Sequence, residues 1–140
     1  MRFRFGLVCL VLVVTSSAAF AATSAGYGMG GWMYKFEPVI AEANRSGELF
    51  RITGHCQSAC TTFLGIRNVC VERSASVLFH AGHDDKRVIS PYWTARFMRA
   101  YNAPLRKYLA AGHYMETLEF HTVSGADLID RFGYKECPRA

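Results

Sequence analysis

Two polar side chains in the middle of the chain have the types and settings that acyl transfer needs. Ser58 lies in the segment GHCQSAC, residues 54–60, and His80 ends the apolar run VLFH at 77–80. A serine hydroxyl becomes a nucleophile when an imidazole accepts its proton, and backbone N–H groups stabilise the oxyanion that then forms. We therefore consider Ser58 as a nucleophile and His80 as its base.

The surroundings of Ser58 leave a second interpretation open. A strand that stops at Gly54 and a helix that starts at Ser58 would make this serine a helix N-cap, which is a common role for serine. The pair Gly30-Gly31 also precedes a helix, and its backbone N–H groups, together with that of Ala59, would form an oxyanion hole at the same edge of a sheet. The sequence alone does not separate cap from nucleophile.

The remaining chain predicts alternating helices and strands. Residues 32–46 have apolar residues at helical spacing, and Gly47 is a suitable stop. We also expect helices at 58–66, at 91–111 with a break near Pro104, and at 122–132 opened by Ser124. Short strands are expected at 49–53, 68–71 and 76–80. Strands separated by helices favour an α/β layer with parallel strands.

Two further groups in the sequence have ordinary structural interpretations. Aromatic residues between Tyr92 and Tyr108 recur at roughly helical spacing, which favours core packing over a cofactor site. The segment His83-Asp84-Asp85 is expected as an exposed polar turn, although with His80 it would alternatively be a metal-ligand cluster. We expect no cofactor and no metal.

The first 21 residues predict a secretory signal peptide. Arg2 and Arg4 precede a short apolar run at 6–14, and Ala19-Phe20-Ala21 offers small residues around a cleavage point after Ala21. A membrane anchor is the alternative, but the run is short for a bilayer core of about 30 Å. We expect residues 22–140 to form a single domain that is periplasmic or secreted, without a stable membrane anchor.

Composition limits what the exported part does. The chain has 140 residues, of which 51% are hydrophobic and 19% charged, which excludes a disordered chain. Loss of Arg2 and Arg4 with the signal lowers the formal charge from +5 to +3. The remaining basic residues are scattered, so no nucleic-acid partner is expected.

Four cysteines lie outside the signal: Cys56, Cys60, Cys70 and Cys137. An even number in an exported domain favours two disulfides, for which three pairings exist. We expect Cys60 with Cys70 and Cys56 with Cys137. A zinc site that also uses His80 and His83 is the alternative, although the chain lacks a C-x-x-C pair.

The order of these pieces resembles the proteolytic subunit of the Clp protease and the related crotonase-like fold (ClpP/crotonase-like). The matching pieces are, in order, Gly30-Gly31, GHCQS at 54–58, VCV at 69–71 and VLFH at 77–80. The segment GHCQSACT with the later FHA is similar to a group of small exported bacterial proteins of this type. The resemblance implies that Ser58 is the nucleophile, His80 the base, and Gly31 and Ala59 the oxyanion donors.

The third member of a catalytic triad is the point where the chain departs from this family. The family's aspartate precedes a terminal helix, and here Phe120 stands near its place, with Glu119 beside it and Asp127 further on. Glu119 and Asp127 are the candidates. A serine hydrolase acting on a peptide or ester is one hypothesis. A binding protein that keeps the fold without turnover is the other, and the lack of an acid that orients His80 would favour it.

Overall fold

Helix ends fall where the sequence places capping residues. The computed structural model describes residues 22–139, so the predicted signal peptide lies outside the described residues. A short 3-10 helix η1 (Met33–Lys35) precedes helix α1 (Glu37–Ser46), which ends at Gly47 with a φ of 71°. That left-handed conformation favours glycine. The prediction of a helix stopped by Gly47 is confirmed.

The predicted helix at 91–111 is a broken pair. Helix α2 (Pro91–Arg99) is capped by Ser90, and helix α3 (Ala103–Ala111) is capped by the side chain of Asn102. The break lies at residues 100–102 and not at Pro104, because proline fits the first turn of α3, where its missing N–H has no helical partner to lose.

Within residues 22–139, five short strands form two small sheets. β1 (Phe50–Ile52) pairs in parallel with β3 (Val69–Val71). β2 (His55–Gln57) pairs in parallel with β4 (Ser76–Phe79), and β4 pairs antiparallel with β5 (His121–Ser124). The architecture is therefore mixed α/β, with parallel pairs as expected at β1–β3 and β2–β4 and an antiparallel strand, β5, that was not expected.

Strands β2 and β5 are the elements that the sequence analysis missed. Gly54 was expected to end the strand before Ser58, but its φ of 56° turns the chain from β1 into β2 and so into the second sheet. Strand β5 overlaps the start of the helix predicted at 122–132, and Val123 is its one buried residue among exposed or half-buried neighbours. Ser124 then caps the short helix α4 (Gly125–Asp130), as predicted.

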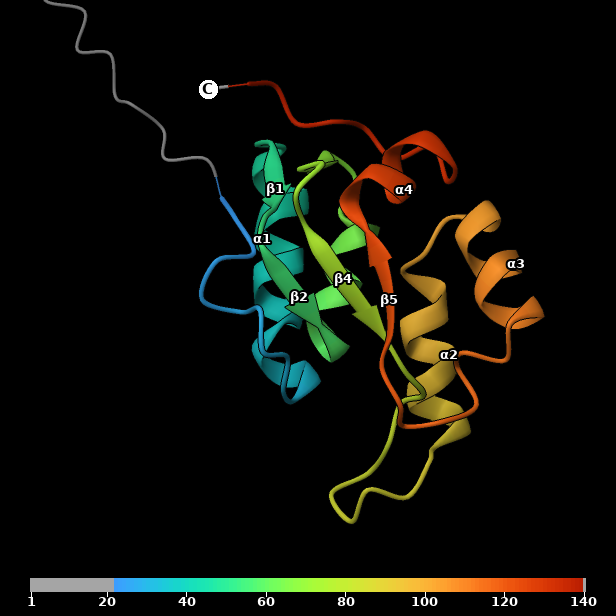
Figure 1. Ribbon diagram of the computed structural model, residues 1–140. Coiled ribbons are helices and arrows are strands. Elements are labelled where there is room, and N and C mark those ends of the chain that lie inside the picture. Colours follow the sequence, from blue (N-terminus) through green and yellow to red (C-terminus); the bar gives the residue numbers. More distant parts are fainter. Residues whose placement is uncertain (1–21, 140) are drawn as a thin grey trace, which may run out of the picture.

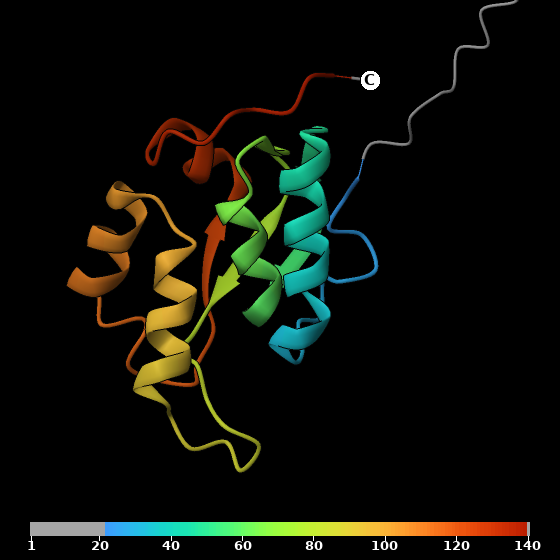
Figure 2. The same ribbon diagram turned by 180° about the vertical axis from the view of Figure 1, so that it is seen from behind.

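One face of the strands is covered by helices. Figures 1 and 2 show α1, the 3-10 helix η2 (Ser58–Gly65) and α2 side by side on the same face, with α3 and α4 near β5. An aromatic cluster fills the space beneath α1 and η2, where the rings of Phe36 and Phe50 lie 5.3 and 4.7 Å from that of Phe63. Such contacts bury the largest apolar areas in the core.

Both disulfides are present, but their pairing differs from the expected one. Cys56 bonds to Cys60 and Cys70 bonds to Cys137. Cys56 lies in β2, two residues before η2 begins, and Cys60 lies in the first turn of η2. Their Cα atoms are 5.3 Å apart. The C-terminal segment lies beside β3, so that the Cys137 N–H donates to the Val71 carbonyl. With all four sulfurs bonded to each other, the cysteines do not provide a zinc site. Within residues 22–139, no helix has the length and apolar character to cross a membrane.

Candidate functional site

Ser58 lies at the carboxyl end of β2 in an unusual backbone conformation. Its φ is 56°, a left-handed value that few residues other than glycine adopt without strain. The Cys56–Cys60 disulfide brackets it, and the Thr61 hydroxyl donates to its carbonyl at 2.7 Å. Gln57 occupies the cap position of η2, and no side chain caps this helix. Ser58 is therefore not the helix cap that the sequence left open.

The glycine loop passes directly against Ser58. A Cβ on Gly30 would lie 2.7 Å from the Cβ of Ser58 and 3.4 Å from the nitrogen of Ala59, so only glycine fits this approach. The Gly30 N–H donates to the Tyr27 carbonyl at 3.0 Å and is not available as an oxyanion donor. Gly31 instead lines the same cavity as Ser58. The two predicted donors, Gly31 and Ala59, thus belong to segments that meet at Ser58.

His80 follows β4 and Ser58 follows β2, so both come at the carboxyl ends of two paired parallel strands. It is 5% exposed and lines the cavity that Ser58 also lines. Burial lowers the pKa of His80 below its ordinary value; the Ala81 backbone opposes this shift, and the neighbouring His83 and Arg87 add to it. The imidazole is therefore neutral at neutral pH, which is the form that accepts a proton.

Neither candidate for the third catalytic residue contacts His80. The buried Nδ1 of His80 has no hydrogen-bond partner among the described residues. Glu119 is exposed. Asp127 lies beyond the far end of β5, where its N–H donates to the Ser124 hydroxyl and its carboxylate pairs with Arg131 at 3.5 Å. The β4–β5 register places Phe120 beside His80 instead, with ring centroids 5.0 Å apart at 90°.

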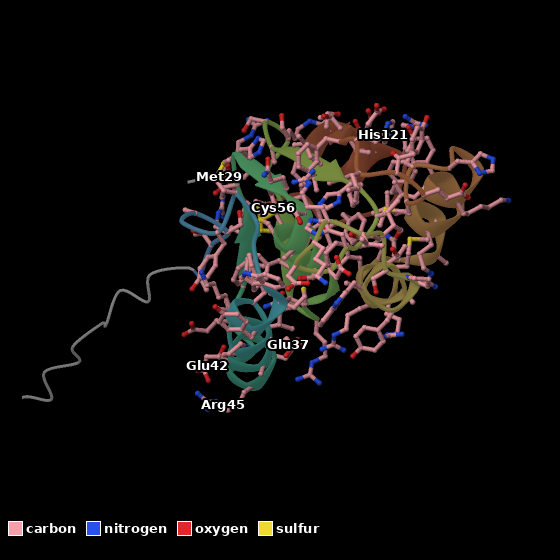
Figure 3. All side chains as sticks on the ribbon, turned by 90° about the horizontal axis from the view of Figure 1, so that it is seen from below. Met29, Glu37, Glu42, Arg45, Cys56 and His121 are labelled. Carbon is pink, nitrogen blue, oxygen red and sulfur yellow. A yellow bond between two sulfur atoms is a disulfide. The ribbon has the colours of Figure 1, made fainter. Side chains whose placement is uncertain are left out.

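The cavity in front of Ser58 and His80 has a volume of about 570 Å³ and a mostly apolar wall. Its apolar lining consists of Met29, Trp32, Met33, Tyr34, Trp93, Phe97, Leu118 and Phe120. Figure 3 views the molecule from this end, with Met29 and Glu37 of the lining and Cys56 of the nearby disulfide labelled. Trp93 and Phe97 were expected only as core residues of a helix. Their spacing is the same for either role, so the sequence held no signal that would identify them.

The other histidines serve local structure or line the cavity rim. His55 is exposed and bonds Gln57, while His113 bonds Glu116 at the surface. His83 lies in the predicted polar turn, and its ring stacks on that of His80 at 5.8 Å, so it also lines the cavity. Within the part of the chain that is described, no group of three or more His, Cys, Asp or Glu side chains is placed to hold a metal ion.

No protein-family model, curated protein sequence or solved structure matches this chain. The Clp-protease-like relationship remains a prediction from sequence motifs. The arrangement of Ser58, His80 and the cavity therefore carries the functional argument.

Proposed function

We propose that the protein is a serine hydrolase of Clp-protease-like type that acts on a peptide or ester. Ser58 is the nucleophile, His80 the general base, and the N–H groups of Gly31 and Ala59 the oxyanion donors. The main support is that Ser58, in a strained conformation after one parallel strand, and His80, after the neighbouring strand, line one cavity. Residues held at such φ values cluster at active sites, and in this chain Arg87 and His113 share such a value with Ser58.

The proposed reaction uses these residues as follows. Because Nδ1 of His80 is buried, Nε2 is the nitrogen left to take the proton from the Ser58 hydroxyl. Oγ then bonds to the acyl carbon, and the imidazolium returns its proton to the leaving amine or alcohol as the scissile bond breaks. A water molecule, deprotonated by the same imidazole, releases the acid and regenerates Ser58.

The proposal includes an exported location. Two disulfides suit an oxidising compartment, since cytosolic thiols are kept reduced. We propose that residues 1–21 are a cleaved signal peptide and that the rest functions in the periplasm or outside the cell.

One observation favours the second candidate, a binding protein without turnover. In a triad, the acid fixes the tautomer of the histidine and stabilises its charged form. Here Phe120 stands beside the ring, and Nδ1 has no partner among the described residues. A dyad of this kind is expected to be slower than a complete triad.

A fluorophosphonate probe tests the proposal on the disulfide-intact protein. We expect one label, on Ser58, which Ser58→Ala abolishes and His80→Ala slows by about a thousandfold. Ser76→Ala is the matched control, because Ser76 is exposed on β4 away from the cavity. Circular dichroism checks that each variant is folded. A wild-type protein that stays unlabelled between about pH 6 and 9 would support the binding protein instead.

A further inference from the structure

The cavity has one positive charge that nothing in the described chain neutralises. Glu37 supplies a carboxylate and Arg87 a guanidinium to its wall. The Glu37 carboxylate pairs with Arg96 of α2. Arg87 makes no ion pair with any residue between 22 and 139. The cavity therefore presents a free guanidinium and a compensated carboxylate.

The backbone that carries Arg87 is fixed by hydrogen bonds. It lies in the loop between β4 and α2, which projects past the carboxyl ends of β2 and β4 in Figure 1. The Asp84 carboxylate accepts from the N–H groups of Lys86 and Val88, each at 2.9 Å. The Arg87 N–H donates to the Asp84 carbonyl at 3.1 Å. The hydrogen bonds of Asp84 thus stabilise this turn, and the turn fixes the backbone of Arg87 beside the cavity.

The rest of the wall suits an apolar ligand of limited size. Both tryptophans of the chain, Trp32 and Trp93, line the cavity together with Phe97, Leu118 and Phe120. Its volume of about 570 Å³ lies within the range of sites for small molecules. A ligand that fits this wall has an apolar body, and one that also satisfies Arg87 has a negative end.

We propose that the cavity selects a small acyl compound with an apolar body and a free carboxylate, which Arg87 binds. Half-esters of dicarboxylic acids, acylated amino acids and the last residue of a peptide share this chemistry. Guanidinium and carboxylate match as a two-pronged hydrogen-bonded pair, which gives more specificity than a point charge. The acyl step rests on the proposed function of Ser58, but binding of the carboxylate does not.

The charge of Arg87 reaches the catalytic pair. It is among the causes that lower the pKa of His80. A bound carboxylate would offset this charge and leave His80 a stronger base while substrate is present. Carboxylate binding would then assist the proton transfer as well as place the substrate.

Equilibrium binding to the Ser58→Ala protein tests the inference without any need for catalysis. The probes are 3-phenylpropionate and the neutral 3-phenylpropanamide, which differ in charge and little in shape. Since both tryptophans line the cavity, intrinsic fluorescence reports binding there. We expect the carboxylate to bind about tenfold more tightly than the amide, and this preference to fall as salt is added.

Two variants assign that preference to one side chain. Arg87→Ala should remove the preference, while Lys86→Ala should keep it, because Lys86 lies on the same turn but not in the cavity wall. Equal affinities for acid and amide, no binding of either, or a preference that survives in Arg87→Ala would each overturn the inference. Because Ser58 is absent from this assay, failure of the fluorophosphonate test leaves the result intact, and the reverse also holds.

Discussion

The two ends of strand β4 differ in how completely their polar groups are paired. At the amino end, the Ser76 N–H donates to the Gly54 carbonyl at 2.8 Å, and the Gly125 N–H donates to the Ala75 carbonyl at 2.7 Å. Ser124 caps α4 there, in the strand paired with this end. At the carboxyl end, His80 has a buried Nδ1 without a partner in the described chain, and the neighbouring Ser58 has a strained φ.

The groups that stabilise the fold and the groups of the candidate site thus lie at opposite ends of a strand of four residues. Unpaired buried groups and strained backbone both disfavour folding, so the surrounding structure has to hold them in place. The amino end supplies hydrogen bonds and ion pairs, whereas the carboxyl end holds the proposed base His80, the proposed nucleophile Ser58 and the cavity that both line. Changes at the two ends should therefore affect different measurements.

The largest expected effect is on stability, from the Cys70–Cys137 disulfide. It joins residues 67 apart, whereas Cys56–Cys60 joins residues four apart. A longer closed loop restricts the unfolded chain more, so replacing Cys70 and Cys137 by alanine should lower the free energy of unfolding by about 4 kcal/mol. The matched Cys56→Ala, Cys60→Ala variant should lose only about 2 kcal/mol on the same basis. Urea unfolding measures both. Equal losses would show that loop length does not govern the stability here.

Two glycines at the two ends give the second comparison. A Cβ on Gly125 would lie 2.0 Å from the Glu72 carbonyl oxygen, so Gly125→Ala should destabilise the fold by about 2 to 3 kcal/mol. Gly30→Ala should also destabilise the fold, because Gly30 has a φ of 71° and its Cβ would lie 2.7 Å from the Gln57 carbonyl oxygen. It should in addition slow fluorophosphonate labelling, since this Cβ would press on Ser58. Unfolding curves and labelling rates measured on both variants check this. The comparison fails if Gly125→Ala, while still folded, loses labelling as fully as Gly30→Ala.

An aspartate at position 120 should supply the third group of a catalytic triad at the carboxyl end of strand β4. Phe120 is 48% exposed with its ring beside His80, so Phe120→Asp is expected to fold and to place an acid near the imidazole. A nearby negative charge raises the pKa of His80 and stabilises the imidazolium. We expect labelling of Ser58 to accelerate about tenfold. Glu119→Gln is the control and should leave the rate unchanged. An unchanged rate in Phe120→Asp would show that His80 does not depend on an acid from this side.

The smallest expected effect is the pH dependence of His80. Because burial holds the pKa of His80 below its ordinary value of 6.5, the labelling rate should fall to half of its maximum at a pH below 6.5. The unfolded chain binds a proton at this histidine at higher pH than the folded protein does. Stability should therefore fall as the pH drops below about 6.5, and should level off below the folded pKa. His80→Gln should remove this contribution in urea unfolding at a series of pH values. A labelling midpoint above 6.5 would contradict the assignment.

Local signals in the sequence predicted the elements that depend on single residues. Gly47 ends α1 and Ser124 opens α4, because a left-handed residue and a capping hydroxyl act within one turn. Ser58 and His80 were also predicted from sequence as a pair, since each follows a short apolar or β-rich run, and the structure places both in the wall of one cavity.

Long-range pairing was what the sequence did not contain. β2 has only three residues, too few to show an alternation of apolar and polar side chains. The direction of β5 depends on the path of the chain after α3. The disulfide partner of Cys70 was missed for the same reason, because nothing local shows that the segment at Cys137 lies along β3. The prediction of Glu119 or Asp127 as the acid relied on family order, whereas the β4–β5 register decides which side chain faces His80.

The segment at residues 135–137 completes the small sheet of β1 and β3. The Val71 N–H donates to the Lys135 carbonyl at 2.8 Å, and Cys137 bonds to Cys70 from the same position. A nascent chain that has emerged only as far as α4 has this edge of β3 uncovered and the Cys70 thiol without its partner. Uncovered strand edges invite pairing with other chains. Because synthesis runs from the amino end, this edge of β3 is covered and the Cys70–Cys137 disulfide is formed only after residue 137 has been made.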